Sequence, residues 1–241
     1  MLYLIGIGMG DAQDITLRGL DAVRKCDAVY LESYTSALQC SMKELEKVYG
    51  KKVLPVGREF VESEQIVAEA KEKDTALLVI GDVFSATTHV QLALACRKQG
   101  IAYQVIHNAS ILTAVGDTGL DLYRFGRIVS IPFHRHDVST PITALQENQR
   151  LGLHTLFLLD LDPASKRYVS AAEAASYLMQ NKIPKTAKAV ACACLGSRQQ
   201  EMMYGTLGQL EKRKLNKFPQ CLIVPGKLHF MEEEMLQWHT K

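Results

Sequence analysis

The sequence has no long hydrophobic run, no Cys-x-x-Cys pair and no large excess of charge of one sign. No apolar stretch approaches the ~18 residues that a membrane-spanning helix needs. Met1–Gly6 lacks the basic start and small-residue cleavage site of a signal peptide, so we expect none. A net charge of +2 over 241 residues does not provide the concentrated basic face that binds nucleic acid. These absences favour a cytoplasmic protein with neither membrane nor nucleic acid among its partners.

The cysteines and histidines do not form a metal-binding pattern. Cys192 and Cys194 alternate, which predicts that both lie on one face of a strand. His134 and His136 lie on a polar connection and are typical of surface histidines. We therefore expect free, buried thiols in a reducing compartment and no metal. The six cysteines are at positions 26, 40, 96, 192, 194 and 221.

The composition, 47% hydrophobic and 22% charged, is that of an ordinary globular protein. A chain of 241 residues has room for two domains of roughly 100 to 130 residues each. The pattern of apolar and polar segments changes after Gly126, where longer polar connections begin. We therefore expect two α/β domains, residues 1–126 and 127–241, and a ligand in the cleft between them.

In the first half, five apolar segments alternate with helical patterns, which predicts a parallel five-stranded sheet covered on both faces. The expected strands are Leu2–Ile7, Ala28–Leu31, Val53–Val56, Leu77–Ile80 and Ala102–Ile106, and the expected helices are Ile15–Lys25 capped by Asp14, a helix from the Ser41 capping box to Tyr49, Gln65–Lys73 and Val90–Lys98.

The second half is also expected to be α/β, with fewer and more separated strands. The predicted strands are Thr155–Leu159, Ala189–Leu195 and Cys221–Val224, and the predicted helices begin at Thr140–Pro141, at the Ser170 capping box, near Thr206 and at Met231.

Three turns at expected strand ends are rich in small residues. Gly81–His89 carries a carboxylate, Asp82, and small hydroxylic side chains, and His107–Ile111 is similar. Ligands of open α/β sheets bind at the carboxyl ends of strands, although Asp82 or Thr87 could instead cap the next helix. The first turn, Gly6–Asp11, has G-x-G-x-G spacing rather than the G-x-G-x-x-G of dinucleotide binders, which disfavours a nicotinamide oxidoreductase.

The same turns carry a family resemblance. Gly6–Asp11 with Asp14–Leu20 resembles the amino-terminal signature of the tetrapyrrole-methylase-like class of S-adenosylmethionine methyltransferases. Within that class the chain is similar to the diphthine synthase family nearly end to end. The segments that carry this similarity are Tyr34–Ser36, Gly81-Asp82 with Ala86–His89, Val105–Ile111, Ala114–Gly116 with Thr118–Leu120, Tyr123–Gly126, Gly152–Leu156 and Val224–His229.

The resemblance implies an enzyme that methylates the aminocarboxypropyl-histidine of translation elongation factor 2 in diphthamide biosynthesis. It implies three N-methylations, or a fourth on the carboxylate, and the sequence does not decide between them. It also implies S-adenosyl-L-methionine as cofactor, S-adenosyl-L-homocysteine as product, and a homodimer. The positions that match the family's cofactor contacts are Met9, Asp82, Ser85, Ser110, Ile111, Leu159, Leu195 and Gln220.

Three residues depart from the family pattern. Val83 replaces a proline, Cys194 an arginine and Gln220 a histidine. Glutamine still offers a donor and an acceptor, so we expect weaker cofactor binding or altered substrate handling before loss of activity. Two other functions stay open: a methyltransferase of tetrapyrroles or other small molecules, and a non-catalytic relative that binds the cofactor.

The pattern does not identify catalytic residues. A free α-amino group titrates near ~8, so a useful fraction of the acceptor is neutral at pH 7 and a dedicated base is helpful rather than obligatory. Tyr34 is a candidate aromatic surface for the quaternary ammonium product, or a packing residue. His89 is a second candidate residue of the site, or it is the cap at a helix start.

Overall fold

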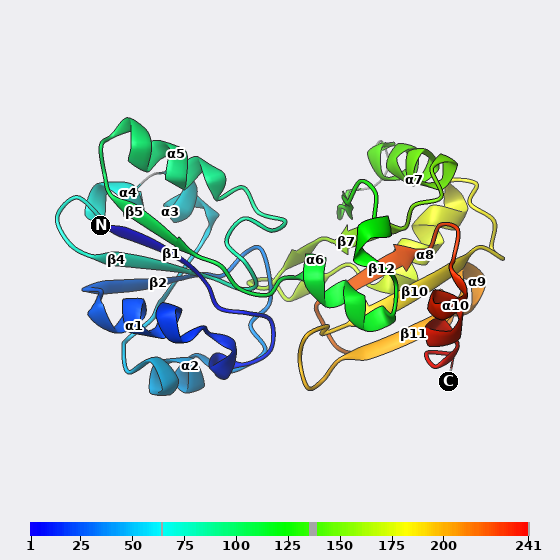
Figure 1. Cartoon of the computed structure of the whole chain (residues 1–241), viewed down its shortest axis with the longest axis horizontal. Helices are drawn as coiled ribbons and strands as arrows, with labels where there is room; N and C mark the ends of the chain where they lie inside the picture. The colour runs from blue at the N-terminus through cyan, green and yellow to red at the C-terminus, as the bar shows by residue number, and fades with distance from the viewer. Residues whose placement is uncertain (64, 135–138, 241) are drawn as a thin grey trace. The chain divides into compact units, whose positions relative to one another are not determined.

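The computed structural model describes residues 1–63, 65–134 and 139–240, and the chain divides into two compact units, Met1–Ala114 and Val115–Lys241 (Figure 1). The sequence predicts this boundary at residue 126. Residues 115–126 group with the second unit, where Gly126 N donates to His154 O at 2.9 Å and Arg124 pairs with Glu232. None of the helices in the described ranges is long and apolar enough to span a membrane.

The first unit is built on a five-stranded sheet in the order β3-β2-β4-β1-β5, and every neighbouring pair is parallel. This confirms the predicted parallel sheet. The residues of β4 are all buried, as expected for a strand covered on both faces. The strands are β1 (Leu2–Gly6), β2 (Ala28–Glu32), β3 (Leu54–Val56), β4 (Thr75–Val79) and β5 (Tyr103–Ile106).

Local sequence signals set most helix ends in this unit. The Ser41 capping box opens α2, and Gly50 closes it in the left-handed conformation, at φ 70°. Asp14 does not cap α1, because it lies in the short turn η1 and Thr16 accepts from Gly19 N instead. The helical elements are η1 (Ala12–Asp14), α1 (Leu17–Lys25), α2 (Met42–Tyr49), α3 (Arg58–Glu62), α4 (Gln65–Glu69), α5 (Val90–Lys98) and α6 (Ile111–Ala114).

The second unit holds another five-stranded sheet, in the order β11-β10-β12-β7-β6. Only the β6–β7 pair is parallel, and the others are antiparallel. The expectation of fewer strands is therefore wrong, because β11 and β6 were not predicted. The strands are β6 (Val129–Ile131), β7 (Thr155–Leu159), β10 (Lys188–Ala193), β11 (Glu201–Thr206) and β12 (Gln220–Val224), with a separate hairpin of β8 (Leu161–Asp162) and β9 (Arg167–Tyr168).

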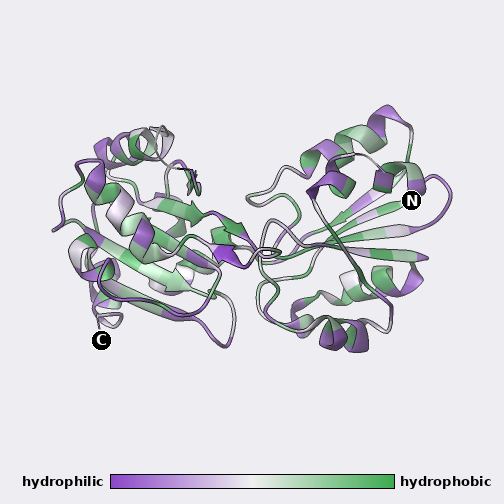
Figure 2. Cartoon of the chain, turned by 180° about the vertical axis from the view of Figure 1, so that it is seen from behind, coloured by the Kyte–Doolittle hydropathy of each residue, from purple (hydrophilic) through white to green (hydrophobic). Residues whose placement is uncertain are grey.

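The helices of the second unit cover a core of aliphatic and small residues. The Ser170 capping box is confirmed. Thr140 is the first helical residue rather than the cap, since Ser139 precedes it. In both units the helices carry hydrophilic as well as hydrophobic residues (Figure 2). The helical elements are η2 (Val115–Thr118), η3 (Leu122–Arg124), α7 (Thr140–Arg150), α8 (Ala171–Gln180), α9 (Leu207–Leu210) and α10 (Phe230–Gln237).

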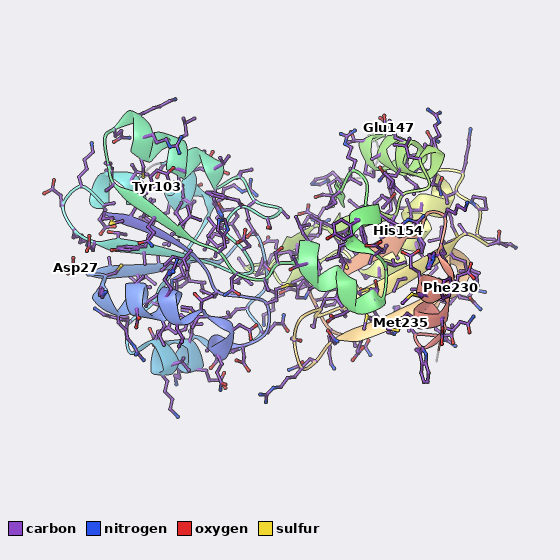
Figure 3. All side chains as sticks on the ribbon, in the orientation of Figure 1. Asp27, Tyr103, Glu147, His154, Phe230 and Met235 are labelled. Atoms are coloured by element: carbon purple, nitrogen blue, oxygen red, sulfur yellow. The ribbon has the colours of Figure 1, made fainter. Side chains whose placement is uncertain are left out.

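A buried ionic group connects α10 to the segments that precede β6 and β7. Figure 3 labels one of its members, His154, and Phe230 at the start of α10. Glu232 Oε1 accepts from His154 Nε2 at 2.9 Å and from Asp121 N at 2.9 Å. Its Oε2 accepts from Arg124 at 3.0 Å and from His229 N at 2.7 Å. Since His154 Nδ1 accepts from Gly226 N at 3.0 Å, both ring nitrogens of His154 are engaged in structural bonds.

All six cysteines are free, as predicted, and five of them are buried. The prediction that Cys192 and Cys194 share a strand face is wrong, because β10 ends at Ala193 and Cys194 has a positive φ of 51°. Within the described residues, no group of three or more possible metal ligands occurs. His134 is exposed, and His136 lies outside the described residues.

Candidate functional site

Five of the eight predicted cofactor residues lie at one edge of the first sheet. Because β4, β1 and β5 are adjacent and parallel, their carboxyl ends meet there. Met9 follows β1, Asp82 and Ser85 follow β4, and Ser110 and Ile111 follow β5.

Glycines allow the first two of these loops to touch. Gly8 N donates to Gly81 O at 3.2 Å and Gly81 N donates to Gly8 O at 2.7 Å. A Cβ on Gly6 would lie 2.7 Å from Gly81 O, and Gly8 has a φ of +80°. The G-x-G spacing is therefore required by close backbone approach. Asp14 stabilises the turn, since its carboxylate accepts from Met9 N at 3.2 Å and Gly10 N at 2.6 Å.

Asp82 is the centre of the hydrogen-bond network at this edge. Its Oδ1 accepts from Phe84 N and from Ser85 Oγ, both at 3.1 Å. Its Oδ2 accepts from His107 Nδ1 at 2.8 Å and from Asn108 N at 3.1 Å. Burial opposes ionisation, but these hydrogen bonds outweigh it and hold the pKa of the Asp82 carboxyl below its ordinary value.

This network decides what Asp82 does in the loop. The helix-cap interpretation is wrong, because His89 is the cap position of α5 and no side chain caps this helix. Thr87 Oγ1 donates to Val83 O at 2.6 Å and accepts from His89 N at 3.5 Å, before the helix begins. Four donors use the accepting positions of the carboxylate. Asp82 therefore joins the loops after β4 and β5.

The loop after β5 presents a hydroxyl at the start of a short helix. Ser110 is buried, and its Oγ accepts from Leu112 N at 3.2 Å, which leaves the hydroxyl hydrogen free to donate. Ile111 begins α6 and is half-buried. Ser85 and Ser110 thus place two hydroxyls at this edge, of which that of Ser85 donates to Asp82.

The other three predicted residues lie at one edge of the second sheet. Leu159 ends β7, Gln220 begins β12 and Leu195 lies just beyond β10. The antiparallel register places Ala193 opposite Gln220 and Leu158 opposite Cys221. All three residues are buried.

Gln220 uses its whole side chain within the second unit. Its Oε1 accepts from Ala171 N at 2.8 Å, and its Nε2 donates to Leu215 O at 2.9 Å and Lys217 O at 2.8 Å. The side chain of this glutamine, which departs from the family pattern, is therefore held by hydrogen bonds to three backbone groups in two segments. Cys194 donates through Sγ to Phe218 O at 3.2 Å.

The half-buried Tyr34, just after β2, and the buried His89, directly before α5, form an aromatic pair. Their ring centroids are 6.4 Å apart, and Tyr34 Oη and His89 Nε2 are buried without a hydrogen-bond partner. The Arg58 guanidinium lies 5.0 Å from the Tyr34 ring centroid. One cation of the protein itself therefore already occupies a face of this ring. Burial, with the nearby Glu32 and Glu62 charges, raises the pKa of Tyr34 to about 12.

Two residues of this edge were not singled out from the sequence. Glu32 is fully buried and accepts from Tyr34 N and Thr35 N, both at 2.6 Å, and from Thr35 Oγ1. His107 pairs with Asp82. Its position directly after a predicted strand was a usable signal, because ligands of open α/β sheets bind at the carboxyl ends of strands.

Comparisons with known proteins identify the family of the chain. The family Tetrapyrrole (Corrin/Porphyrin) Methylases matches residues 1–211. Diphthine methyl ester synthase of Homo sapiens is 41% identical over 98% of this chain and 94% of its own. Diphthine synthase of Methanocaldococcus jannaschii is 39% identical over 99% of this chain and 98% of its own. A crystal structure of diphthine synthase superposes with a TM-score of 0.93 at 37% identity, covering 99% of this chain and 95% of that one. The chain therefore belongs to the tetrapyrrole (corrin/porphyrin) methylase family and, within it, to the diphthine synthases.

Proposed function

We propose that this protein transfers methyl groups from S-adenosyl-L-methionine to the aminocarboxypropyl-histidine of translation elongation factor 2, on the way to diphthamide. The observation that carries the proposal is similarity over almost the full length, at 38–42% identity, to proteins named diphthine synthase or diphthine methyl ester synthase. Such a match includes both units and the loops at the edges of both sheets.

The residues at the edge of the first sheet suit the cofactor. A Cβ on Gly6 or Gly8 would collide with Gly81 or Asp14, so these glycines are required for the close contact that brings the loops after β1 and β4 together. The hydroxyls of Ser85 and Ser110 are of the kind that bind ribose and adenine. We propose that these residues, with Met9 and Ile111, hold the cofactor in the first unit, and that Asp82 positions their loops.

In the second unit we propose cofactor contacts from Leu159, Leu195 and Gln220. Because the Gln220 side chain is already bonded to three backbone groups, its contribution comes from its backbone. The departure from histidine then costs less cofactor affinity than the sequence alone suggests, since the side chain is not the contacting group.

S-adenosyl-L-methionine, when bound, supplies the methyl group as an already activated electrophile. The task of the chain is to bind the acceptor amine in line, exclude water and accept the protons that the amine loses. Three N-methylations of an ammonium release three protons. A carboxylate needs no deprotonation, so a fourth transfer would make no such demand.

Intact-protein mass spectrometry tests the proposal. Elongation factor 2 that carries the unmethylated aminocarboxypropyl-histidine is incubated with this protein and S-adenosyl-L-methionine. We expect a gain of three methyl masses, for diphthine, or four, for its methyl ester, and the number distinguishes the two activities named among the relatives. No gain, with cofactor binding shown by calorimetry, would reject the proposal.

The same assay separates the two rival functions. A small-molecule methyltransferase would convert S-adenosyl-L-methionine in the presence of a tetrapyrrole and without any protein substrate. A non-catalytic relative would bind the cofactor with no turnover on either substrate.

We also propose that the protein acts in the cytoplasm as a homodimer, as the family resemblance implies. Sedimentation equilibrium checks the dimer: a mass of twice 26.8 kDa supports it, and a single-chain mass at micromolar concentration rejects it.

A further inference from the structure

His107 and Asp82 form a histidine–carboxylate pair at the carboxyl edge of the first sheet. The Nδ1 to Oδ2 distance is 2.8 Å, and the side chain of His107 is 67% exposed while that of Asp82 is 9% exposed. The Phe84 ring lies edge-on to the imidazole, with centroids 6.1 Å apart. The pair therefore combines a buried carboxylate, fixed by three further donors, with an imidazole that faces outward.

The bonding pattern fixes the proton on the imidazole. An ionised carboxylate only accepts hydrogen bonds, so Nδ1 of neutral His107 carries the hydrogen and Nε2 carries a lone pair. Among the described residues, Asp82 is the one carboxylate that hydrogen-bonds His107, and no hydrogen bond to Nε2 is formed. Nε2 is thus an available proton acceptor that points away from its carboxylate.

The two buried histidines of the described chain, His89 and His154, are unsuited to this role. His89 is fully buried, and its Nδ1 lies 3.3 Å from Val83 O. His154 has both nitrogens engaged, by Glu232 and Gly226. His107 differs because it lies on the same short loop as Ser110 and Ile111.

We propose that His107 is the catalytic proton acceptor for the N-methylation steps and that Asp82 is its positioning residue. The inference rests on the proposed function. A substrate ammonium gives one proton to Nε2: its N–H bond breaks, the electron pair stays on the substrate nitrogen, and an N–H bond forms at Nε2. The imidazolium faces the Asp82 carboxylate, which stabilises its charge, and the exposed ring returns the proton to water before the next transfer.

The test compares wild type with His107→Asn. The asparagine amide donates from near the position of Nδ1, so the bond to Asp82 is kept and only the proton acceptor is removed. His134→Gln, at an exposed histidine in the second unit, is the matched control. The rate of the first methyl gain is measured by intact mass from pH 6.5 to 9, with saturating S-adenosyl-L-methionine.

A proton-accepting His107 predicts a pH-dependent defect. About a tenth of an amine with a pKa near ~8 is neutral at pH 7, so the variant is expected to lose up to about tenfold in kcat there. The deficit shrinks by pH 9, where the amine arrives neutral. The KM for S-adenosyl-L-methionine is unchanged, and His134→Gln matches wild type. An equal loss at every pH, or no loss, would overturn the inference; no methylation by wild type would instead reject the proposed function.

A second readout needs no turnover. Nitrogen-15 histidine NMR of the free protein assigns the His107 signals as those absent from His107→Asn. We expect the neutral ring to be the tautomer with hydrogen on Nδ1, which the bond to Asp82 favours, and a lone pair on Nε2. The opposite tautomer would remove the lone pair that the step requires and would also overturn the inference.

Discussion

At Gly6 the first sheet has no room for a side chain. A Cβ there would lie 2.7 Å from Gly81 O and 3.1 Å from Asn108 Cβ, and backbone atoms do not move aside cheaply. We expect Gly6→Ala to lower the free energy of unfolding by about 1–3 kcal/mol, measured by urea denaturation. Gly57→Ala is the control, because no atom lies within 4 Å of its added Cβ; equal stability of the two variants would contradict this packing argument.

Gln220 is a second residue whose size and polarity matter. Gln220→Ala leaves the buried Ala171 N without its acceptor and two carbonyls without their donor. We expect a loss of about 1–3 kcal/mol in the free energy of unfolding. Gln220→His restores one acceptor and one donor and should recover part of it. Should Gln220→Ala instead leave stability intact and abolish cofactor binding in calorimetry, the side chain would be a direct ligand.

At the scale of elements, α10 depends on one buried carboxylate. Glu232→Gln replaces one accepting oxygen by an NH2 group that faces donors from Arg124, His154 or backbone N–H groups. We expect this change to cost about 2–4 kcal/mol and to speed hydrogen exchange in Phe230–Gln237. Glu233→Gln, on an exposed position of the same helix, should leave both unchanged. Equal exchange in the two variants would show that α10 is held by other contacts.

Elements with strong local signals were predicted well from the sequence. The first sheet follows from five apolar runs, and the capping boxes at Ser41 and Ser170 gave the helix starts directly. The element β11 was missed because it is a mostly half-buried strand with no alternation to reveal it. The predicted helix from Thr206 is only four residues long, since its capping box sets a start and not a length.

For the site, too, features that are local in sequence were predicted and contacts between distant residues were not. Strand-end loops and the resemblance identified the edge of each sheet, because both signals are local in sequence. The pairing of His107 with Asp82 joins residues 25 positions apart, and the use of Gln220 by Ala171 joins residues 49 apart. Such contacts depend on which strands become neighbours, which no local pattern encodes.

At the scale of the whole molecule, several buried groups make stability depend on pH in the same direction. Burial lowers the pKa of His89, His154 and His239 below the ordinary value near 6.5. The unfolded chain therefore binds more protons than the folded one below that pH, and stability falls as the pH falls. Hydrogen bonds outweigh burial and lower the pKa of Asp82 and Glu232. The stabilisation from these two carboxylates is therefore present above their pKa in the unfolded chain and is lost as the pH falls toward their lower pKa in the folded chain.

We therefore expect the free energy of unfolding to be highest near neutral pH and to fall in two stages, first below about pH 6.5 and again below about pH 4. Urea denaturation at pH 7.5, 6.5, 5.5 and 4.5 measures the first stage. His154→Gln, whose amide nitrogen reaches the position of Nε2 and still donates to Glu232, should be less stable than wild type at pH 7.5 but lose less on acidification to pH 5.5. If the free energy of unfolding of the variant fell with pH as steeply as that of wild type, His154 would have to bind its proton equally well in the folded and unfolded chains. The full burial of His154 and the hydrogen bond from Gly226 N to its Nδ1 both oppose this.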